Sequence, residues 1–317
     1  KAKIYKKSMV LMDTLVTISV VSYSGGVAEK AIVRAFEKIK RLDGLINFFS
    51  DKSELSSINN NAGITPVKVS PETLDLIEKA VYASEKTEGA FDATIGPVIT
   101  QWNFSGAATQ KVPDDELIKE KRRLVNYRMI TIDKERATVY LNEKGMLLDL
   151  GGIAKGYAAD MASDELKKNG IKSGLISVAG DIKAFGLKPD SAPWLIGIKN
   201  PRPKGGDDEI MAAIELRDTA ISTSGDYERF FIKNGKRYHH LVDPKTGYPS
   251  DKCRSVSVVA ADGVYTDSFA TAVFILGKDR GMQVLQKMGF EGIIVDNEDK
   301  VHMPDGLRGR VELKGNN

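Results

Sequence analysis

The stretch MLLDLGGIAKGYAAD at residues 146–160 constrains the fold more than any other part of this sequence. Its first five residues are apolar except for Asp149 and predict a buried strand; the Gly151-Gly152 pair permits a tight turn, and helical spacing of apolar residues follows. Backbone N–H groups at such a junction suit an anion such as a phosphate. Asp149 and Lys155 are locally unfavourable, because a buried carboxylate needs a partner and a helix N-terminus disfavours a cation. The stretch therefore predicts either a ligand site or a local arrangement in which these charges pair with each other or with neighbours.

The composition is that of a globular protein. The chain has 317 residues, of which 42% are hydrophobic and 28% charged, and a net charge of +3. It lacks a block of lysines and arginines with interleaved aromatic residues, so we expect no nucleic-acid partner. No apolar run approaches the roughly 20 residues that span a bilayer. The single cysteine, Cys253, rules out an intramolecular disulfide and a cysteine-based metal cluster.

Apolar periodicity predicts helices and strands in mixed order. The predicted helices cover residues 27–47, 71–88, 113–123, 265–276 and 279–288, and the main predicted strands cover residues 9–21, 175–179, 194–199, 211–216, 220–222, 237–242, 255–260, 292–296 and 310–313. Residues 90–101 are apolar with few charges and predict a buried or ligand-facing loop. No steady strand–helix–strand rhythm, linker or repeat interrupts the chain. We therefore predict a single α+β domain over residues 1–317, with largely antiparallel sheets.

Asp267 and Thr271 lie four residues apart in a predicted helix and so share a face. Asp267 alone could simply favour the helix dipole near the start of the helix. The pair, however, offers two oxygen ligands to a hard cation. Mg²⁺ takes about six oxygens and usually keeps some from water and substrate phosphates. A backbone carbonyl of the Gly151-Gly152 turn is a further candidate ligand.

Two of the three histidines, His239 and His240, precede a predicted turn at residues 243–247. On a strand they would face opposite sides. Either one could act as a general base near neutral pH, although a structural role is the commoner one for a lone histidine. The sequence contains no nucleophile elbow, Walker A motif or Gly-x-Gly-x-x-Gly motif, which disfavours the ordinary nucleotide-binding folds.

Taken together, these pieces resemble the ApbE-like flavin transferases (FAD:protein FMN transferases) along nearly the whole chain. Each matching segment is short, but eight of them occur in the family's order, which makes the resemblance specific. The segments are Met12-Asp13-Thr14, Phe49-Ser50 with Ser53-Glu54-Leu55-Ser56, GAFDAT at 89–94, LDLGGIAKG at 148–156, AGD at 179–181, STSG at 222–225, HLVDPKTG at 240–247, and Asp267 with Thr271.

The resemblance implies a fold of two interleaved T-fold-like lobes with FAD in a central cleft. It implies that Asp267, Thr271 and the carbonyl of Gly152 bind Mg²⁺, which bridges to the FAD pyrophosphate. The residues implied to line the FAD site are Met12, Phe49, Ala90, Phe91, Asp92, Asp149, Lys155 and Leu241. Phe49 stands where many relatives have tyrosine, a change that keeps ring stacking and removes a hydroxyl hydrogen bond.

The implied reaction is phosphoryl transfer, with FAD as substrate. A threonine or serine hydroxyl of a target flavoprotein attacks the FMN-side phosphorus, and AMP leaves. Mg²⁺, held by Asp267, neutralises charge on the pyrophosphate, and Lys155 adds a positive charge. We expect His240 to take the proton from the attacking hydroxyl. Two alternatives stay open: hydrolysis of FAD to FMN and AMP, and a non-catalytic flavin-binding protein, against which the Asp267–Thr271 pair argues.

The resemblance also bears on partners and location. We expect an acceptor flavoprotein with a Thr/Ser motif, in particular a membrane redox subunit. Relatives are often exported, lipid-anchored bacterial proteins, and this chain begins at Lys1 with no apolar signal region. We therefore expect a processed or trimmed N-terminus and a place in the bacterial cell envelope, periplasmic or extracytoplasmic, rather than the cytoplasm.

Overall fold

An eight-stranded antiparallel sheet organises the chain in the computed structural model, which describes residues 1–104, 110–206 and 209–314. Each pair of neighbouring strands in this sheet runs antiparallel. In spatial order the strands are β1 (Lys3–Leu11), β2 (Thr14–Ser22), β6 (Gly174–Val178), β7 (Asp181–Phe185), β10 (Thr219–Gly225), β13 (Cys253–Ala260), β14 (Glu291–Asp296) and β15 (Val301–His302).

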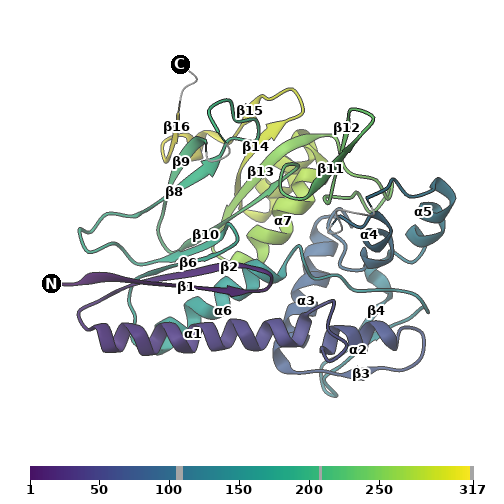
Figure 1. Ribbon diagram of the computed structural model, residues 1–317, viewed down its shortest axis with the longest axis horizontal. Helices are drawn as coiled ribbons and strands as arrows, with labels where there is room; N and C mark the ends of the chain where they lie inside the picture. The colour runs from purple at the N-terminus through teal and green to yellow at the C-terminus, as the bar shows by residue number, and fades with distance from the viewer. Residues whose placement is uncertain (105–109, 207–208, 315–317) are drawn as a thin grey trace.

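Helices α1 (Gly25–Ile46), α6 (Ala154–Lys168) and α7 (Gly263–Leu276) pack against one face of this sheet and against each other (Figure 1). The α1 helix begins at Ser24, whose side chain accepts the Val27 N–H, and it buries one apolar stripe. The α7 helix is different, because all of its residues except Tyr265 and Thr271 are buried. A helix that is buried on all sides carries any polar side chain into the protein interior.

A second layer covers part of the opposite face of the sheet. It is a three-stranded sheet of β8 (Trp194–Lys199), β9 (Ile210–Leu216) and β16 (Val311–Leu313). Trp194, Ile196 and Ile214 of this layer belong to one buried cluster with Ile221 and Val259 of the main sheet. The molecule thus has a helix layer, a central sheet and a small outer sheet.

The remaining elements surround this framework. The other strands form a sheet of β3 (Val67–Lys68), β5 (Thr138–Leu141) and β4 (Ile130–Asp133), and a hairpin of β11 (Phe230–Lys233) and β12 (Lys236–His239). The other helices are α2 (Glu54–Asn60), α3 (Pro71–Lys86), α4 (Gly96–Trp102), α5 (Asp115–Arg122), α8 (Lys278–Met288) and α9 (Asp305–Arg308). Within the described residues, no helix has both the length and the apolar character needed to cross a membrane.

The architecture confirms the predicted α+β class with largely antiparallel sheets, and α1, α3, α5, α7 and α8 confirm the predicted helices. The predicted loop at residues 90–101 is only partly right, because α4 begins at Gly96 with Pro97 in its first turn. That residues 1–317 form a single domain stays a prediction.

The predicted strand at residues 146–150 is wrong. The segment is buried, but Leu147 makes only an isolated bridge with Ile95. The side chain of Asn59 replaces a neighbouring strand: its Oδ1 accepts the Leu148 N–H at 2.7 Å and its Nδ2 donates to the Leu148 carbonyl at 3.0 Å. A single side-chain amide therefore satisfies backbone groups that a sheet would otherwise pair.

Candidate active site

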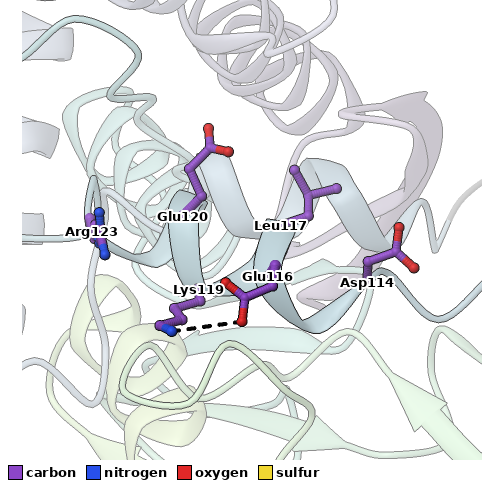
Figure 2. A pocket seen from close by; sticks show the side chains of 6 residues that line it. All are labelled: Asp114, Glu116, Leu117, Lys119, Glu120 and Arg123. Carbon is purple, nitrogen blue, oxygen red and sulfur yellow. Dashed lines mark ion pairs between the residues drawn. The ribbon is translucent and has the colours of Figure 1, made fainter.

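The surface has a depression along α5, and none of the predicted site residues lines it (Figure 2). Its side chains are mostly charged and exposed, and Lys119 and Glu116 form an ion pair across 3.7 Å. Exposed ion pairs of this kind contribute little binding or folding free energy. Of the predicted site residues, Gly152, Lys155, Asp267 and Thr271 lie close together where α6, α7 and β7 meet.

The helices α6 and α7 touch at two glycines, Gly156 and Gly263. A Cβ added to Gly156 would lie 1.9 Å from the Gly263 carbonyl oxygen, so no side chain fits between the two backbones. Asp160 of α6 accepts the N–H groups of Gly263 and Val264, each at 2.8 Å, and thereby caps the start of α7. This contact brings the first turn of α6 against the first turns of α7, which carry Asp267.

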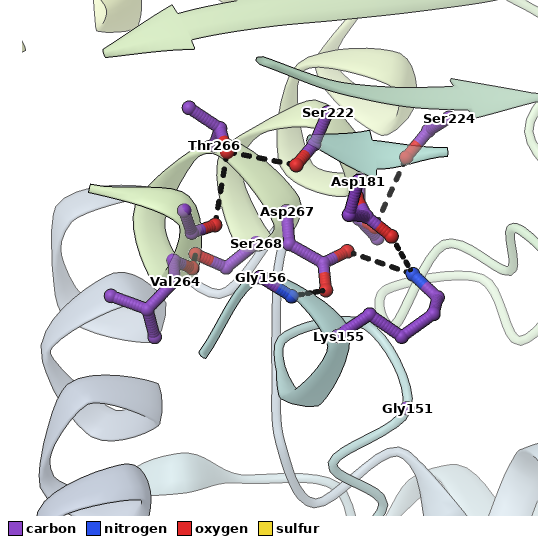
Figure 3. Close-up of polar contacts among 12 residues, drawn as sticks. Gly151, Lys155, Gly156, Asp181, Ser222, Ser224, Val264, Thr266, Asp267 and Ser268 are labelled. Atoms are coloured by element: carbon purple, nitrogen blue, oxygen red, sulfur yellow. Dashed lines mark hydrogen bonds and ion pairs between the residues drawn. The ribbon is translucent and has the colours of Figure 1, made fainter. Parts of the chain in front are cut away.

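The contact between the helices places Lys155 between two buried carboxylates (Figure 3). Lys155 Nζ donates to Asp181 Oδ2 at 2.5 Å and to Asp267 Oδ1 at 3.4 Å. The other oxygen of Asp267, Oδ2, accepts the Gly156 N–H at 3.0 Å. Asp181 and Asp267 are only 5% and 4% exposed. One ammonium is therefore shared by two carboxylates.

This sharing changes the acid–base properties of the cluster. Burial raises the pKa of Asp267, and the neighbouring charge of Asp181 raises it further, to about 6. Burial would lower the pKa of Lys155, but the charges of Asp181 and Asp267 outweigh that effect and raise it. One ammonium is therefore set against two carboxylates, which leaves the cluster one positive charge short of neutrality.

The predicted metal ligands lie next to this cluster. Thr271 is one helical turn beyond Asp267, and its Oγ1 lies 3.3 Å from Ser224 Oγ. A Cβ built on Gly152 would lie 3.5 Å from Thr271 Oγ1, so the glycine turn approaches the same hydroxyl. In the described part of the chain, no three His, Cys, Asp or Glu side chains form a metal cluster. A carboxylate, a hydroxyl and a carbonyl are nevertheless hard oxygen donors of the kind that Mg²⁺ takes, and substrate phosphates commonly complete such a set.

Several residues predicted to line the FAD site have protein partners. Asp92 is buried and accepts the Thr94 hydroxyl at 2.6 Å and the Tyr127 N–H at 3.1 Å, and burial raises its pKa. These bonds hold the loop that carries Ala90 and Phe91, both of which are buried. Phe91 reaches the glycine turn, because a Cβ on Gly152 would lie 3.3 Å from its ring.

Asp149 and Lys155, the two awkward charges of the sequence, do have partners. Asp149 Oδ1 accepts the Gly151 N–H at 2.8 Å, so one N–H of the predicted anion cradle is already bonded within the chain. Lys155 contacts Asp181 and Asp267. In the structure, therefore, each of these two charges has a neighbouring protein group as its partner.

Three other predicted FAD-site residues differ in exposure. Phe49 is 80% exposed and contacts Phe48 edge to face, whereas Leu241 is buried. Met12 and Asp13, with φ of 53° and 55°, form the two-residue turn between β1 and β2. The Met12 N–H donates to Asp43 of α1 at 3.0 Å. An exposed aromatic ring is free to stack on a planar ligand.

The two neighbouring histidines occupy different surroundings. His239 is buried, and its Nε2 bonds the Ser250 carbonyl at 2.8 Å. His240 is half-buried, and its Nδ1 lies 3.3 Å from the Arg229 carbonyl. Because a carbonyl only accepts, Nδ1 carries the proton and Nε2 keeps its lone pair. Burial and the charges of Arg229 and Lys155 hold the pKa of His240 well below its usual value, so this ring is neutral at neutral pH.

The sequence analysis missed Asp181 and Ser224 as site residues. Both lie in segments quoted for the family resemblance, but neither was given a role. Asp181 directly follows the turn at Ala179 and Gly180, which have φ of 60° and 141°. Positive φ is uncommon in a non-glycine residue and marks this turn in the structure. Because φ cannot be read from the sequence, it could not have identified Asp181 beforehand.

Comparisons with known proteins identify the family. A model of the ApbE family matches residues 12–294. A FAD:protein FMN transferase of Klebsiella pneumoniae is 33% identical over 90% of this chain and 86% of its own length, and one of Treponema pallidum is 31% identical over 98% and 89%.

Solved structures show the same fold. The ApbE protein of Thermotoga maritima superposes with a TM-score of 0.90 at 32% identity, covering 97% of this chain and 99% of its own. The flavin transferase ApbE from Vibrio cholerae gives a TM-score of 0.87 at 28% identity, with 98% and 100% covered. These likenesses confirm the fold class that the resemblance implied. The chain belongs to the ApbE family.

Proposed function

We propose that this chain transfers FMN from FAD to a threonine or serine hydroxyl of an acceptor flavoprotein, with release of AMP, and that it needs Mg²⁺ to do so. The name FAD:protein FMN transferase, shared by its relatives, supports flavin transfer from FAD. The observation that carries the proposal is the buried Lys155–Asp181–Asp267 cluster beside Thr271 and Gly152. Two carboxylates that share one ammonium favour a further cation.

In this proposal each side chain has a defined task. Asp267, Thr271 and the Gly152 carbonyl would hold Mg²⁺, which when bound supplies Lewis-acid stabilisation of the pyrophosphate. Lys155 Nζ adds a positive charge near the phosphates. His240 Nε2 accepts the proton of the attacking hydroxyl. A new bond forms from that oxygen to the FMN phosphorus, and AMP leaves with the electron pair of the broken bond.

The ligand role of Asp267 is tested by Asp267→Ala. We expect this variant to lose Mg²⁺-dependent transfer, measured by mass spectrometry as the FMN mass added to a co-expressed acceptor domain. Asp164→Ala, at an exposed position of α6, is the matched control and should transfer normally. Near-normal flavinylation by Asp267→Ala would sink the metal assignment.

Transfer and hydrolysis are separated by the same components. The chain is incubated with FAD and Mg²⁺, with and without acceptor domain, and FMN, AMP and protein-bound flavin are measured. AMP release that depends on the acceptor supports transfer. Equal formation of free FMN and AMP without acceptor would instead identify an FAD pyrophosphatase, and tight FAD binding with no turnover would identify a flavin-binding protein.

The base assignment has its own test. We expect His240→Ala to slow transfer at neutral pH while leaving FAD affinity, measured by fluorescence quenching, within about twofold. Full transfer by this variant at neutral pH would show that another group takes the proton.

We further propose a membrane redox subunit as acceptor and the bacterial cell envelope as location. Both rest on the family resemblance. Fractionation of cells that express the full-length protein, with detection by antibody, tests the location: recovery in the cytoplasmic fraction alone would contradict it.

A further inference from the structure

Asp181 lies at the end of a strained turn. It is the first residue of β7 and pairs in register with Val178 of β6, so that Ala179 and Gly180 form a two-residue turn. Ala179 has φ of 60°, a left-handed conformation that is unfavourable for an L-residue. Strain of this kind persists where the surrounding structure enforces it, and it clusters at functional sites. Here the turn delivers a buried carboxylate to the Lys155 ammonium.

The two oxygens of Asp267 have different partners. Oδ2 is used by the Gly156 N–H, while Oδ1 faces Lys155 at 3.4 Å. A divalent cation bound by Asp267 and the lysine ammonium would therefore compete for Oδ1, because like charges repel strongly over a few ångströms in a buried site. The contact of Lys155 with Asp181 is the shorter one, at 2.5 Å.

We propose that Asp181 is a positioning residue: it holds the Lys155 ammonium to one side of Asp267, so that Oδ1 can accept a divalent cation. The inference rests on the proposed metal dependence and adds a role for a residue outside the ligand set. Without the Asp181 carboxylate, Asp267 is the acidic side chain left in contact with the ammonium among the described residues. Lys155 then becomes an internal competitor of the metal.

A double-mutant cycle tests the proposal. Mg²⁺ is titrated by calorimetry into the chain without FAD, so that the readout is independent of transfer. We expect Asp181→Asn to weaken Mg²⁺ binding about tenfold and Lys155→Met to tighten it. In the Lys155→Met background, Asp181→Asn should weaken binding by less than about threefold, because only the loss of a neighbouring charge remains. Asp164→Asn controls for net charge.

Each outcome decides between roles. Equal weakening by Asp181→Asn in both backgrounds would overturn the proposal, because Asp181 would then act on the metal directly. Unchanged binding in Asp181→Asn would overturn it as well. If the unaltered chain binds no Mg²⁺ in the absence of FAD, this inference is overturned; the metal requirement of the proposed function is judged separately, from transfer with FAD and Mg²⁺ present.

A conservative variant guards against misfolding. Circular dichroism melting checks every variant, and Asp181→Glu, which keeps the carboxylate, should retain most of the Mg²⁺ affinity. If Asp181→Asn does not fold, the same Mg²⁺ titrations are made with Asp181→Glu, in the unaltered chain and in the Lys155→Met background. Asp181→Glu that weakens binding equally with and without Lys155 would then overturn the proposal.

Discussion

Two aspartates, Asp267 and Asp296, are almost equally hidden from solvent, with 4% and 3% of their surface exposed. Their pKa values nevertheless move in opposite directions. The pKa of Asp267 rises to about 6, and that of Asp296 falls to about 2. Burial by itself therefore does not decide how a carboxylate behaves in this protein.

The difference lies in the partners. Burial opposes the ionisation of Asp296 too, but His302 Nε2 at 2.7 Å and the N–H groups of Lys300 and Glu298 outweigh it. Lys278 adds a cation at 3.7 Å. Asp267 accepts one backbone N–H and shares one ammonium with Asp181. The charge of Asp296 is thus balanced by nearby cations and N–H donors. Asp267 instead shares its one cation with Asp181, which is the condition expected of a carboxylate that binds a further cation.

The sharpest test of this contrast is Asp267→Asn. We expect transfer to fall by about a thousandfold or more, because a neutral amide is a poor Mg²⁺ ligand. The fold should gain about 1 kcal/mol in metal-free buffer at neutral pH, because an unfavourably buried charge is removed. Transfer rates and urea denaturation in EDTA measure the two effects. A destabilised variant that still transfers would reverse the roles assigned to the two aspartates.

The contact between α6 and α7 predicts the next largest effect. Gly156→Ala would force a Cβ to within 1.9 Å of the Gly263 carbonyl oxygen. We expect a loss of about 3 kcal/mol in unfolding free energy and weaker Mg²⁺ binding. Gly44→Ala in α1 is the control, because its added Cβ has no neighbour within 4 Å; this variant should be stabilised by about 0.5–1 kcal/mol. Similar stability of the two variants would mean that the helices can separate at little cost.

Asp296→Asn should show the opposite pattern to Asp267→Asn. We expect a loss of about 2 kcal/mol in unfolding free energy, because His302 and Lys278 lose their charged partner, and normal transfer by the folded fraction. Chemical denaturation at pH 7 and an initial-rate assay measure these quantities. A catalytic defect without a stability defect would place Asp296 in the catalytic machinery.

The pH dependence gives the finest test. The pKa of Asp296 is about 2 in the folded state and about 3.9 in the unfolded chain, so its stabilisation is present above pH 4 and is lost as pH falls towards 2. The pKa of Asp267 is raised, so its ionisation reduces metal-free stability as pH rises from about 4 to about 6. The stability differences between each Asn variant and the unaltered chain should therefore change with pH in opposite senses, each by about 1–2 kcal/mol. Urea denaturation in EDTA from pH 3 to 7 measures both, and parallel curves would contradict the comparison.

Local sequence patterns predicted the framework well. The apolar spacing of α1 and the four-residue step from Asp267 to Thr271 needed only helical geometry. The failure at residues 146–150 has a specific cause: the sequence marks the segment as buried, but it cannot reveal that Asn59, far away in the chain, satisfies its backbone.

The site was predicted only in part for the same reason. Asp149 and Lys155 were recognised as charges in need of partners, but the partner Asp181 is 26 residues from Lys155 and no local period connects them. In the sequence, Gly156 looks only like a residue that destabilises a helix. Its contact with Gly263 is visible only in the three-dimensional structure. Long-range pairs and backbone contacts thus lie beyond what periodicity can predict.

The hydrogen bond from the Gly156 N–H to Asp267 Oδ2 also offers a spectroscopic reporter. Glycine amides fall in an uncrowded region of a nitrogen–proton correlation spectrum, and this one is bonded directly to the proposed metal ligand. Its chemical shift should follow the charge carried by that carboxylate. Its hydrogen-exchange rate should report how often the two helices part. A single backbone resonance would thus report on both charge and packing where α6 meets α7.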